Sequence, residues 1–342
     1  MTLADFDYDL PPDQIAQRPP ARRDGGRLMV LRRDSKEVTH ASIGELPGLL
    51  PADALVVIND SKVLPARLRA KRATGGRVEF LLLERISVGR WTCMFRASKG
   101  LRSGEILQLL TPDPKDSAEA PSTARVKVCN APYEGRCQIS LDEDWIYRLG
   151  AIPLPPYIQR PADDRDVERY QTVYAAEEGS VAAPTAGLHL TNGLLSALEE
   201  RGIELTRVTL HVGPGTFVPV RQDDPDEHRM DEERYEVSQR SAAAIARARS
   251  AGRPIIAVGT TVVRTLEASA GLAAARRTDL FIRPGYEFNV VSGLMTNFHL
   301  PRSTLLMLVC AFRGRERVLA AYREAVVAGY RFYSYGDAML LL

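Results

Sequence analysis

The chain has 342 residues, and its composition, 45% hydrophobic and 26% charged, is that of an ordinary soluble globular protein with room for two domains or for one large domain with an insertion. The formal net charge of +2 averages over uneven stretches, because residues 61–110 contain eleven Lys/Arg against three Asp/Glu and residues 223–236 contain eight acidic side chains against two arginines. The basic stretch favours a polyanionic partner, although a well-solvated β surface accounts for it equally well.

The four cysteines show neither CxxC pairing nor metal-ligand spacing, so we expect reduced thiols in a cytoplasmic protein. The N-terminal residues are acidic and interrupted by prolines, unlike a signal peptide. The longest apolar run, residues 305–312, is too short to cross a bilayer, so no membrane partner is expected. Since no apolar stripe typical of an interface stands out, we expect a monomer.

The first sixty residues end in ALVVIND (54–60), a continuous apolar run that predicts a strand buried on both faces, as in a parallel sheet. Residues 66–141 differ: short segments rich in β-formers alternate with Gly, Pro or Asn, and none has helical periodicity. This pattern is typical of a small antiparallel barrel or sandwich inserted into a larger domain.

After the proline-rich segment 151–161, strand and helix patterns alternate again. Residues 203–212 and 254–259 predict strands, and residues 315–328 predict an amphipathic helix. Other helices are expected to begin at the capping residues Thr191, Ser238 and Ser303 and at Thr260-Thr261.

The predicted fold class is therefore α/β. We expect a discontinuous α/β domain made of residues 1–62 and 150–342. An inserted antiparallel β domain, a small barrel or a sandwich at residues 63–149, interrupts it.

Polar clusters follow the predicted strands. Ligands of open α/β sheets bind beyond the carboxyl ends of the strands, where loops and helix N-termini converge. Any one cluster could be routine turn chemistry, but four at equivalent positions favour a shared pocket. The clusters are Asn59–Lys62, Thr185–His189, His211–Thr216 and Gly259–Thr261.

The stretch TLHVGPGTF (209–217) allows two interpretations. Gly-Pro-Gly can be a plain turn with His211 packed under it. Alternatively, the glycines let backbone N–H groups approach a ligand, and a histidine beside them can titrate near neutral pH. The clusters at the other strand ends favour the second interpretation.

Familiar nucleotide and hydrolase motifs are missing: the chain has no GxxxxGK[ST], no GxGxxG opening a helix after a strand, and no GxSxG. His228, Asp231, Glu232 and Glu233 could in principle ligate a metal, but their stretch reads as an exposed acidic loop, so no metal is expected. A pocket of backbone amides, hydroxyls and a carboxylate suits a nucleoside-like molecule. The N-terminal arginines Arg18, Arg22, Arg23 and Arg27 could hold phosphates or form surface ion pairs.

Taken together, eight ordered motifs resemble the S-adenosylmethionine:tRNA ribosyltransferase-isomerase family of the queuosine pathway, from about residue 5 to the C-terminus. The resemblance is weakest in the loops of the insert and around residues 112–150. The motifs are RPPARRDGGRLMVL (18–31), INDSKVLPARL (58–68), YQTVYA (170–175), VAAPTAGLHLT (181–191), TLHVGPGTFVPV (209–220), VGTTVVRTLE (258–267), NFHLPRSTLLML (297–308) and YRFYSYGDAMLL (330–341).

The resemblance implies a fold with an α/β domain interrupted by a β-barrel. It also implies transfer of the ribosyl part of S-adenosylmethionine to the aminomethyl group of 7-aminomethyl-7-deazaguanine (preQ1) at the tRNA wobble position. The product is epoxyqueuosine, with adenine and methionine released. S-Adenosylmethionine is then the ribosyl-donor co-substrate, and the anticodon loop of preQ1-containing tRNA is the partner.

Roles for individual residues follow as hypotheses. His211 and His189 are candidates for proton transfer, and Asp60 for holding a ribose hydroxyl or the cationic amine. His299 reads as structural. Arg18, Arg22, Lys71 and Arg72 are assigned to tRNA. Assigned to substrate or cofactor binding are Asn59, Thr185, Gly187, Gly213, Gly215, Thr216, Thr260, Thr261, Arg264 and Asp337.

The sequence departs from the family pattern at several places. Ser61-Lys62 stands where Thr-Arg is expected, so a point charge replaces a bidentate fork. Leu190 stands where an aromatic residue is expected, and Asp231 where a histidine is expected. Two other interpretations stay open: a non-catalytic tRNA-binding module, and a different S-adenosylmethionine-dependent RNA transferase such as a methyltransferase.

Overall fold

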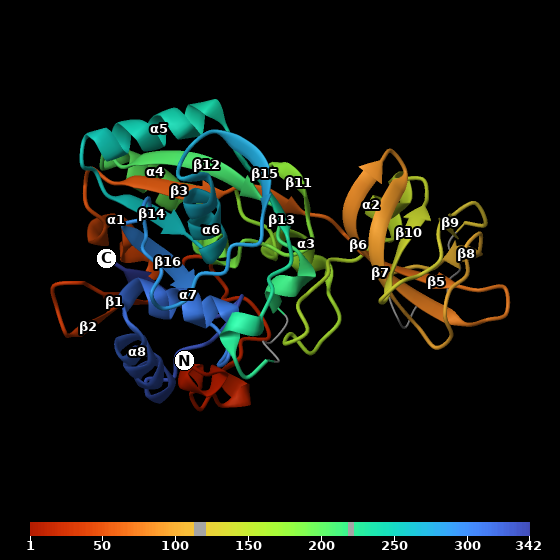
Figure 1. The fold of residues 1–342 in the computed structure, drawn as a ribbon, viewed down its shortest axis with the longest axis horizontal. Helices are drawn as coiled ribbons and strands as arrows, with labels where there is room; N and C mark the ends of the chain where they lie inside the picture. The colour runs from red at the N-terminus through yellow and green to blue at the C-terminus, as the bar shows by residue number, and fades with distance from the viewer. Residues whose placement is uncertain (113–120, 218–221) are drawn as a thin grey trace.

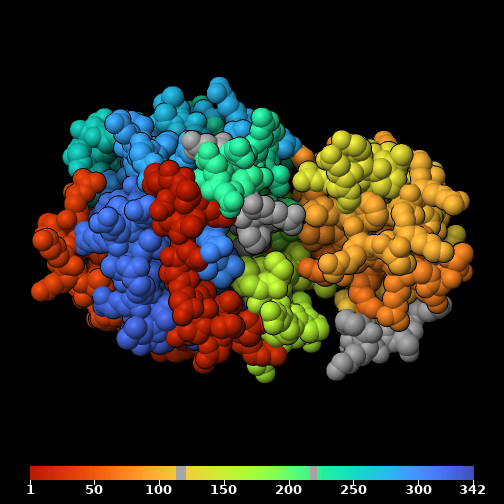
Figure 2. All heavy atoms as spheres, turned by 60° about the horizontal axis from the view of Figure 1, so that its bottom comes forward, coloured from red at the N-terminus to blue at the C-terminus, as the bar shows by residue number. Residues whose placement is uncertain are grey.

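The computed structural model describes residues 1–112, 121–217 and 222–342. They form a large α/β part and a β-barrel beside it (Figure 1). The barrel, orange to yellow, projects as a separate lobe in the space-filling view (Figure 2). This architecture confirms the predicted fold class, an α/β sheet interrupted by an antiparallel barrel.

The central sheet has nine strands, and its middle strands β12, β3, β14 and β16 run parallel to one another. A buried parallel strand needs apolar side chains on both faces, which explains the unbroken run LVVIN. In sheet order the strands are β15 (Ala274–Thr278), β13 (Glu233–Val237), β12 (Glu204–Leu210), β3 (Leu55–Asn59), β14 (Ile255–Val258), β16 (Gly293–Asn297), β17 (Ala338–Leu341), β1 (Arg27–Leu31) and β2 (Val38–Ser42).

Helices cover both faces of this sheet and enclose two apolar cores. One core contains side chains of α5 (Gln239–Ser250), α6 (Thr260–Ser269), α7 (Thr304–Arg313) and α8 (Arg315–Val327). The core on the other face contains side chains of α1 (Leu46–Leu49), α4 (Asn192–Glu200) and the 3-10 helix η4 (Thr185–His189). Short 3-10 helices complete this part: η1 (Leu3–Phe6), η2 (Pro12–Gln14), η3 (Ile43–Glu45), η5 (Pro214–Phe217) and η6 (Pro225–Glu227).

Three helices begin at the predicted caps. The Thr191 hydroxyl accepts a hydrogen bond from the Leu194 N–H (3.1 Å), and Ser238 accepts one from the Ser241 N–H (3.1 Å). Ser303 caps α7 in the same way through Leu306 (3.2 Å). Each hydroxyl therefore satisfies a backbone donor that the first helical turn leaves free.

The barrel closes in the order β10-β7-β6-β5-β8-β9, and every neighbouring pair is antiparallel. Alternation along each strand sends one set of side chains into a separate core, to which helix α2 (Asp144–Leu149) adds Ile146 and Leu149. The domain limits at residues 63 and 149 stay a prediction. The strands are β5 (Arg67–Lys71), β6 (Arg77–Ser87), β7 (Arg90–Ala97), β8 (Ile106–Leu109), β9 (Arg125–Val128) and β10 (Arg136–Ser140).

A small two-stranded sheet lies where the chain leaves the α/β part for the barrel. Strand β4 (Ser61–Val63) directly follows β3 and pairs in parallel with β11 (Glu177–Ser180). Helix α3 (Asp164–Arg169) precedes β11 in the returning chain. Within the described residues, no helix combines the length and apolarity that a membrane span requires.

Candidate functional site

The ends of the parallel strands bring the predicted clusters to one edge of the sheet. Asn59 closes β3, His211 follows β12, Gly259 follows β14, and Asn297 closes β16. Helix η4 reaches the same edge, because the Asn297 side-chain amide (Nδ2) donates a hydrogen bond to Nε2 of His189 (3.0 Å). The order of the strands, which the sequence does not state, places these segments next to one another.

Side-chain alternation then separates neighbouring residues at this edge. Asn59 points toward α6: its amide donates to the Leu210 carbonyl (3.0 Å) and to the Thr261 hydroxyl (3.3 Å). Asp60 lies on the opposite face, where its carboxylate accepts a hydrogen bond from Thr209 (2.7 Å). Asn59 therefore holds β3, β12 and α6 together, whereas Asp60 faces the α4 side of the sheet.

A pocket of about 540 Å³ opens beside His211, between the barrel and the α/β part. Ion pairs cross it, from Arg277 to Glu84 of the barrel and from Arg136 of the barrel to Asp231 (3.8 Å). The Tyr147 hydroxyl also donates to Glu178 across the junction (2.7 Å). Side chains of both signs from both parts therefore line one cavity.

His211 is a half-buried member of this lining. Burial lowers the pKa of its imidazole to about 4, and the nearby Arg234 charge adds to the effect. Its Nδ1 is buried without a hydrogen-bond partner among the described residues and packs against Gly179. Gly179 has φ +138°, and a Cβ there would lie 2.9 Å from that nitrogen. The glycine thus leaves room for a neutral imidazole beside the cavity.

A buried ion pair between Glu233 and Arg264 holds the turn after His211 in place. The Gly213 N–H donates to Glu233 (2.9 Å), and the other Glu233 oxygen accepts from Arg264 of α6. Arg264 also donates to the Leu280 carbonyl (3.0 Å). At Gly215 a Cβ would lie 2.3 Å from a carboxylate oxygen of Asp231, so a larger residue would require the Asp231 side chain to move. The predicted Thr216 side chain lies outside the described part of the structure.

Arg264 was predicted to bind substrate, but the structure surrounds its guanidinium with protein acceptors and leaves 3% of the residue exposed. Glu233, considered in the sequence only as part of an acidic loop, is the residue that joins Arg264 to the turn. No local pattern reveals this role, because the contact depends on β13 pairing with β12.

Asp60 lines a second pocket, of about 730 Å³, on the α4 side of β12 and β13. Burial raises the pKa of this carboxyl group, and the hydrogen bond from Thr209 opposes that shift. Along β12 the side chains of Arg207, Thr209 and His211 share one face, because successive residues of a strand alternate. Thr209 and His211 therefore border neighbouring pockets on the same face.

His189 is buried, and its imidazole is hydrogen-bonded to other protein groups. Burial lowers the pKa of its imidazole to about 4, against the nearby Asp337 charge and a hydrogen bond to the Arg23 backbone. Asp337 accepts hydrogen bonds from the backbone N–H groups of Arg27 (2.9 Å) and Arg331 (2.8 Å). Both side chains thus organise the chain around β1 and β17, and neither borders the two pockets described above.

The glycine and threonine positions of the other clusters are closely packed. A Cβ at Gly187 would lie 2.1 Å from the Tyr174 hydroxyl, which explains the glycine in η4, the helix that begins at Thr185. Thr260 and Thr261 are buried at the start of α6, after Gly259 with φ +99°. These residues are therefore packed inside the protein at the carboxyl ends of the parallel strands.

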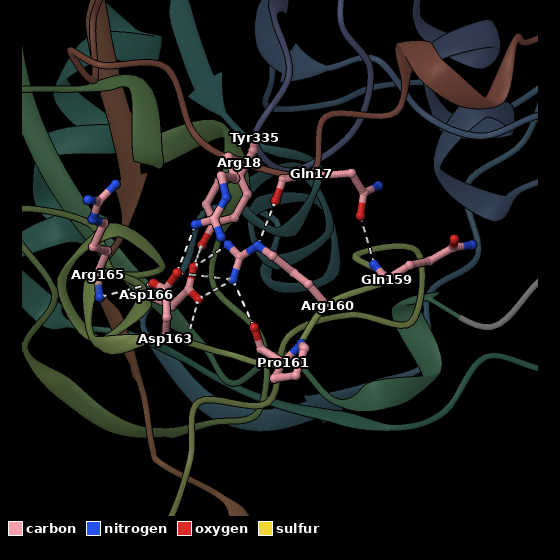
Figure 3. A network of polar contacts seen from close by, with 9 residues as sticks. All are labelled: Gln17, Arg18, Gln159, Arg160, Pro161, Asp163, Arg165, Asp166 and Tyr335. Carbon is pink, nitrogen blue, oxygen red and sulfur yellow. Dashed lines mark hydrogen bonds and ion pairs between the residues drawn. The ribbon is translucent and has the colours of Figure 1, made fainter. Parts of the chain in front are cut away.

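Of the arginines assigned to tRNA, two lie at the surface and one is enclosed. Arg18 pairs with Asp163 (2.8 Å) beside a buried network in which Asp166 accepts from Arg160 and Tyr335 (Figure 3). Arg22 is exposed and pairs with Asp24 (3.0 Å).

In the barrel, Arg72 pairs with Glu105 (3.1 Å) and donates to the carbonyl groups of Lys99 and Gly100. Its guanidinium is therefore taken up within the barrel, whereas the neighbouring Lys71 is exposed on the outer face. His299 is buried and bonded through Nε2 to Thr296 (2.9 Å), in agreement with the structural role expected for it. The described residues contain no group of three or more potential metal ligands.

A mixed sheet whose parallel central strands end at a polar cavity beside the barrel defines an α/β protein with a candidate ligand site at the junction of its two parts. The chain belongs to the family described as queuosine biosynthesis protein, whose model matches residues 3–341. The resemblance stated from the sequence motifs is thereby confirmed.

Relatives and a solved structure agree with this assignment. An S-adenosylmethionine:tRNA ribosyltransferase-isomerase of Anaeromyxobacter dehalogenans (strain 2CP-1 / ATCC BAA-258) is 52% identical, covering 100% of this chain and 99% of the relative. A protein of the same name from Citrifermentans bemidjiense is 46% identical and is matched over the full length of both chains. The crystal structure of an S-adenosylmethionine tRNA ribosyltransferase from Thermotoga maritima is 36% identical, with a TM-score of 0.55 over 99% of this chain and 100% of that one.

Proposed function

We propose that this protein is an S-adenosylmethionine:tRNA ribosyltransferase-isomerase. It transfers and isomerises the ribosyl part of S-adenosylmethionine onto preQ1 at the tRNA wobble position, giving epoxyqueuosine and releasing adenine and methionine. The family and the full-length relatives of that name support this activity. The structural observation that carries the proposal is the neutral imidazole of His211 beside a cavity between the barrel and the strand ends.

The reaction needs a base, because the sulfonium makes the adjacent 5′ C–H acidic. His211 suits this role, since a depressed pKa keeps its imidazole unprotonated at neutral pH and its ring borders the cavity. His189 is less suited, because it is fully enclosed and its Nε2 already accepts a hydrogen bond from Asn297. We therefore assign proton abstraction to His211 and a supporting role to His189.

Charged side chains near the turn serve the remaining demands. Gly213 and Pro214 of the turn border the cavity, and the Gly213 N–H already donates to Glu233, so this N–H positions the turn and is not assigned to the leaving adenine. Acidic side chains such as Glu84 and Asp231 suit a cationic co-substrate at the same place. We propose no metal for this chemistry.

The tRNA is proposed to lie across the junction and along the barrel, with its anticodon loop at the cavity. The outer face of the barrel supports this placement, because Arg77, Lys71, Gln108 and Arg125 lie opposite one another on four adjacent strands. The basic side chains of this row suit the phosphate groups of a nucleic acid. Arg18 and Arg22 supply further exposed positive charge on the α/β part. A cytoplasmic monomer completes the proposal.

The decisive experiment incubates the protein with preQ1-containing tRNA and S-adenosylmethionine labelled in its ribose carbons. The proposal requires label in the tRNA together with equal amounts of free adenine and methionine. Release of S-adenosylhomocysteine would instead identify a methyltransferase. Binding of the tRNA without any product would identify a non-catalytic module.

The same assay tests the base. His211→Asn should lower kcat by about 10²–10⁴-fold while tRNA affinity stays near that of the parent protein, since a positioned base contributes roughly that factor. His189→Asn serves as the comparison and should lower stability more than it lowers kcat. Normal turnover by His211→Asn would remove His211 from the reaction.

A further inference from the structure

The pocket that contains Asp60 carries charges of both signs, and the mechanism proposed above uses none of its residues. Its volume of about 730 Å³ exceeds that of the His211 cavity. Its acidic members come from four segments: Asp60 after β3, Glu177 of β11, Glu199 of α4 and Glu236 of β13. Its basic members are Arg207 of β12 and Arg240 in the first turn of α5.

These charged side chains do not form ion pairs with one another in the described part of the chain. Within residues 1–112, 121–217 and 222–342, no ion pair or side-chain hydrogen bond joins Arg207, Arg240 or Glu236 to another group. Asp60 is about nine-tenths buried, and in the described part of the chain the Thr209 hydroxyl is the side-chain group that donates to its carboxylate. A buried carboxylate with a spare acceptor in a polar pocket is costly unless a donor completes it.

The pocket lies beside the His211 cavity along the same strand. Thr209 borders the Asp60 pocket, and His211 borders the other cavity. The two residues share one face of β12 and lie about 7 Å apart by the rise of a strand. Strand β11 borders both cavities, through Glu177 on one side and Glu178 and Gly179 on the other. A methionyl chain is about long enough to reach from one to the other.

We propose that the Asp60 pocket is the subsite for the amino-acid end of S-adenosylmethionine, a zwitterion with an α-ammonium and an α-carboxylate. This rests on the function proposed above. Asp60 and Glu236 hold the ammonium, and Arg207 and Arg240 hold the carboxylate. The sulfonium and the 5′ carbon then lie toward Thr209 and His211, where the proposed base acts.

An RNA phosphate is the competing occupant, since it would also use Arg207 and Arg240. The acidic lining disfavours it, because Asp60, Glu177 and Glu236 would repel a phosphate group at close range. A zwitterion uses both signs of charge, whereas a phosphate uses only one.

The test removes one charge from the ligand and its partner from the protein. Arg207→Gln and Asp60→Asn are compared with Arg249→Gln, a control on α5 that does not border the pocket. Each protein is titrated calorimetrically with S-adenosylmethionine and with its decarboxylated form, which keeps the amine and the sulfonium. The KM for tRNA is measured in parallel. Arg207 is exposed, so its replacement leaves the core intact.

The parent protein and Arg249→Gln should bind the decarboxylated form roughly ten- to hundredfold more weakly, the usual effect of one charge-assisted hydrogen bond. In Arg207→Gln that difference should shrink several-fold, and Asp60→Asn should bind both forms more weakly. An equal difference in all proteins would overturn the subsite. So would a raised KM for tRNA in Arg207→Gln with unchanged S-adenosylmethionine affinity, which identifies a phosphate contact.

Failure of the subsite and failure of the proposed function are separable. Release of adenine and methionine by the parent protein tests the function alone, and the calorimetric comparison needs no turnover. If the parent protein releases both products but the carboxylate makes no difference to affinity, the function stands and the subsite is wrong.

Discussion

His211 shows how a local environment sets the chemistry of one side chain. Its imidazole is partly enclosed, lies near the positive charge of Arg234, and packs against the bare Cα of Gly179. Burial and the arginine both disfavour imidazolium, so the pKa falls to about 4. The side chain is therefore a neutral proton acceptor throughout the physiological range.

This pKa gives a test at the level of one residue. Removing the Arg234 charge stabilises imidazolium, so Arg234→Gln should raise the pKa of His211 and move the acid limb of the kcat/KM profile to higher pH. The profile from pH 4 to 8 is the measurement. Arg229→Gln, in the same acidic stretch, is the matched control and should leave the limb in place. An unmoved limb in Arg234→Gln would separate His211 from the titrating group.

At the scale of elements, the turn at residues 213–215 depends on two distant segments. Glu233 reaches it from β13, and Arg264 reaches Glu233 from α6. Both members of this pair are buried, so removing only one breaks a buried ion pair, which is strongly destabilising. The turn, the strand and the helix therefore form one structural unit.

Arg264→Met should accordingly lower the free energy of unfolding by about 3–5 kcal/mol. The double variant Arg264→Met/Glu233→Leu should recover part of that loss, because it also removes the carboxylate whose ion pair with Arg264 was broken. Urea unfolding of the three proteins provides the comparison. A loss below about 1 kcal/mol in the single variant would show that solvent or other residues already compensate Glu233.

The barrel offers a second prediction at this scale. Arg77→Glu/Arg125→Glu reverses two charges of the outer row without touching Arg72, whose bonds hold the barrel together. We expect a higher KM for tRNA, an unchanged kcat, and a salt slope smaller by roughly 0.7–0.9 per lost phosphate contact. Arg323→Glu on α8 is the control. If the variant and the control behave alike, the barrel row is only a solvated surface.

For the whole molecule, buried histidines tie stability to pH. Burial lowers the pKa of His189 to about 4 and that of His299 to about 3, both below the unfolded value of 6.5. Between these values the unfolded chain binds more protons than the folded one, so stability rises with pH. It is complete above about pH 6.5 and is lost as the pH falls toward the folded values.

Each such histidine corresponds to a loss on the order of 3 kcal/mol over that range. Thermal unfolding from pH 4 to 8 should show the fall. His299→Gln should start from a lower melting temperature at pH 7 and show a shallower decline, because one titrating group is gone. An identical pH dependence in both proteins would assign the acid sensitivity to carboxylates instead.

Features governed by nearby residues could be predicted from the sequence. Thr191, Ser238 and Ser303 cap helices because a hydroxyl reaches an N–H only three residues away. An inserted barrel or sandwich followed from alternating β-rich segments without helical periodicity, and the family resemblance favoured the barrel. The buried strand at residues 55–59 followed from its unbroken apolar run. The placement of polar clusters at strand ends followed from the same patterns.

The site itself depended on which strands are neighbours and which face each residue takes. Asn59 and Asp60 are adjacent in the chain but turn to opposite faces, one into a structural bond with Thr261 and the other into a pocket. Glu233 acquires its role through pairing of β13 with β12. The Arg72 guanidinium forms an ion pair with Glu105 within the barrel. None of these contacts lies within a few residues of its partner.

By itself, then, the sequence determined the class of fold, the family, the starts of helices α4, α5, α6 and α7 and the set of polar segments from which a site could be built. Periodicity and capping act over one or two turns of the chain, so they can be recognised locally. The eight ordered motifs identify the family along the whole chain. Only the tertiary structure decided that His211 and Asp60 border adjoining cavities while His189 and Arg264 are enclosed. Burial and the approach of distant charges set those roles, and both depend on how the strands are ordered across the sheet.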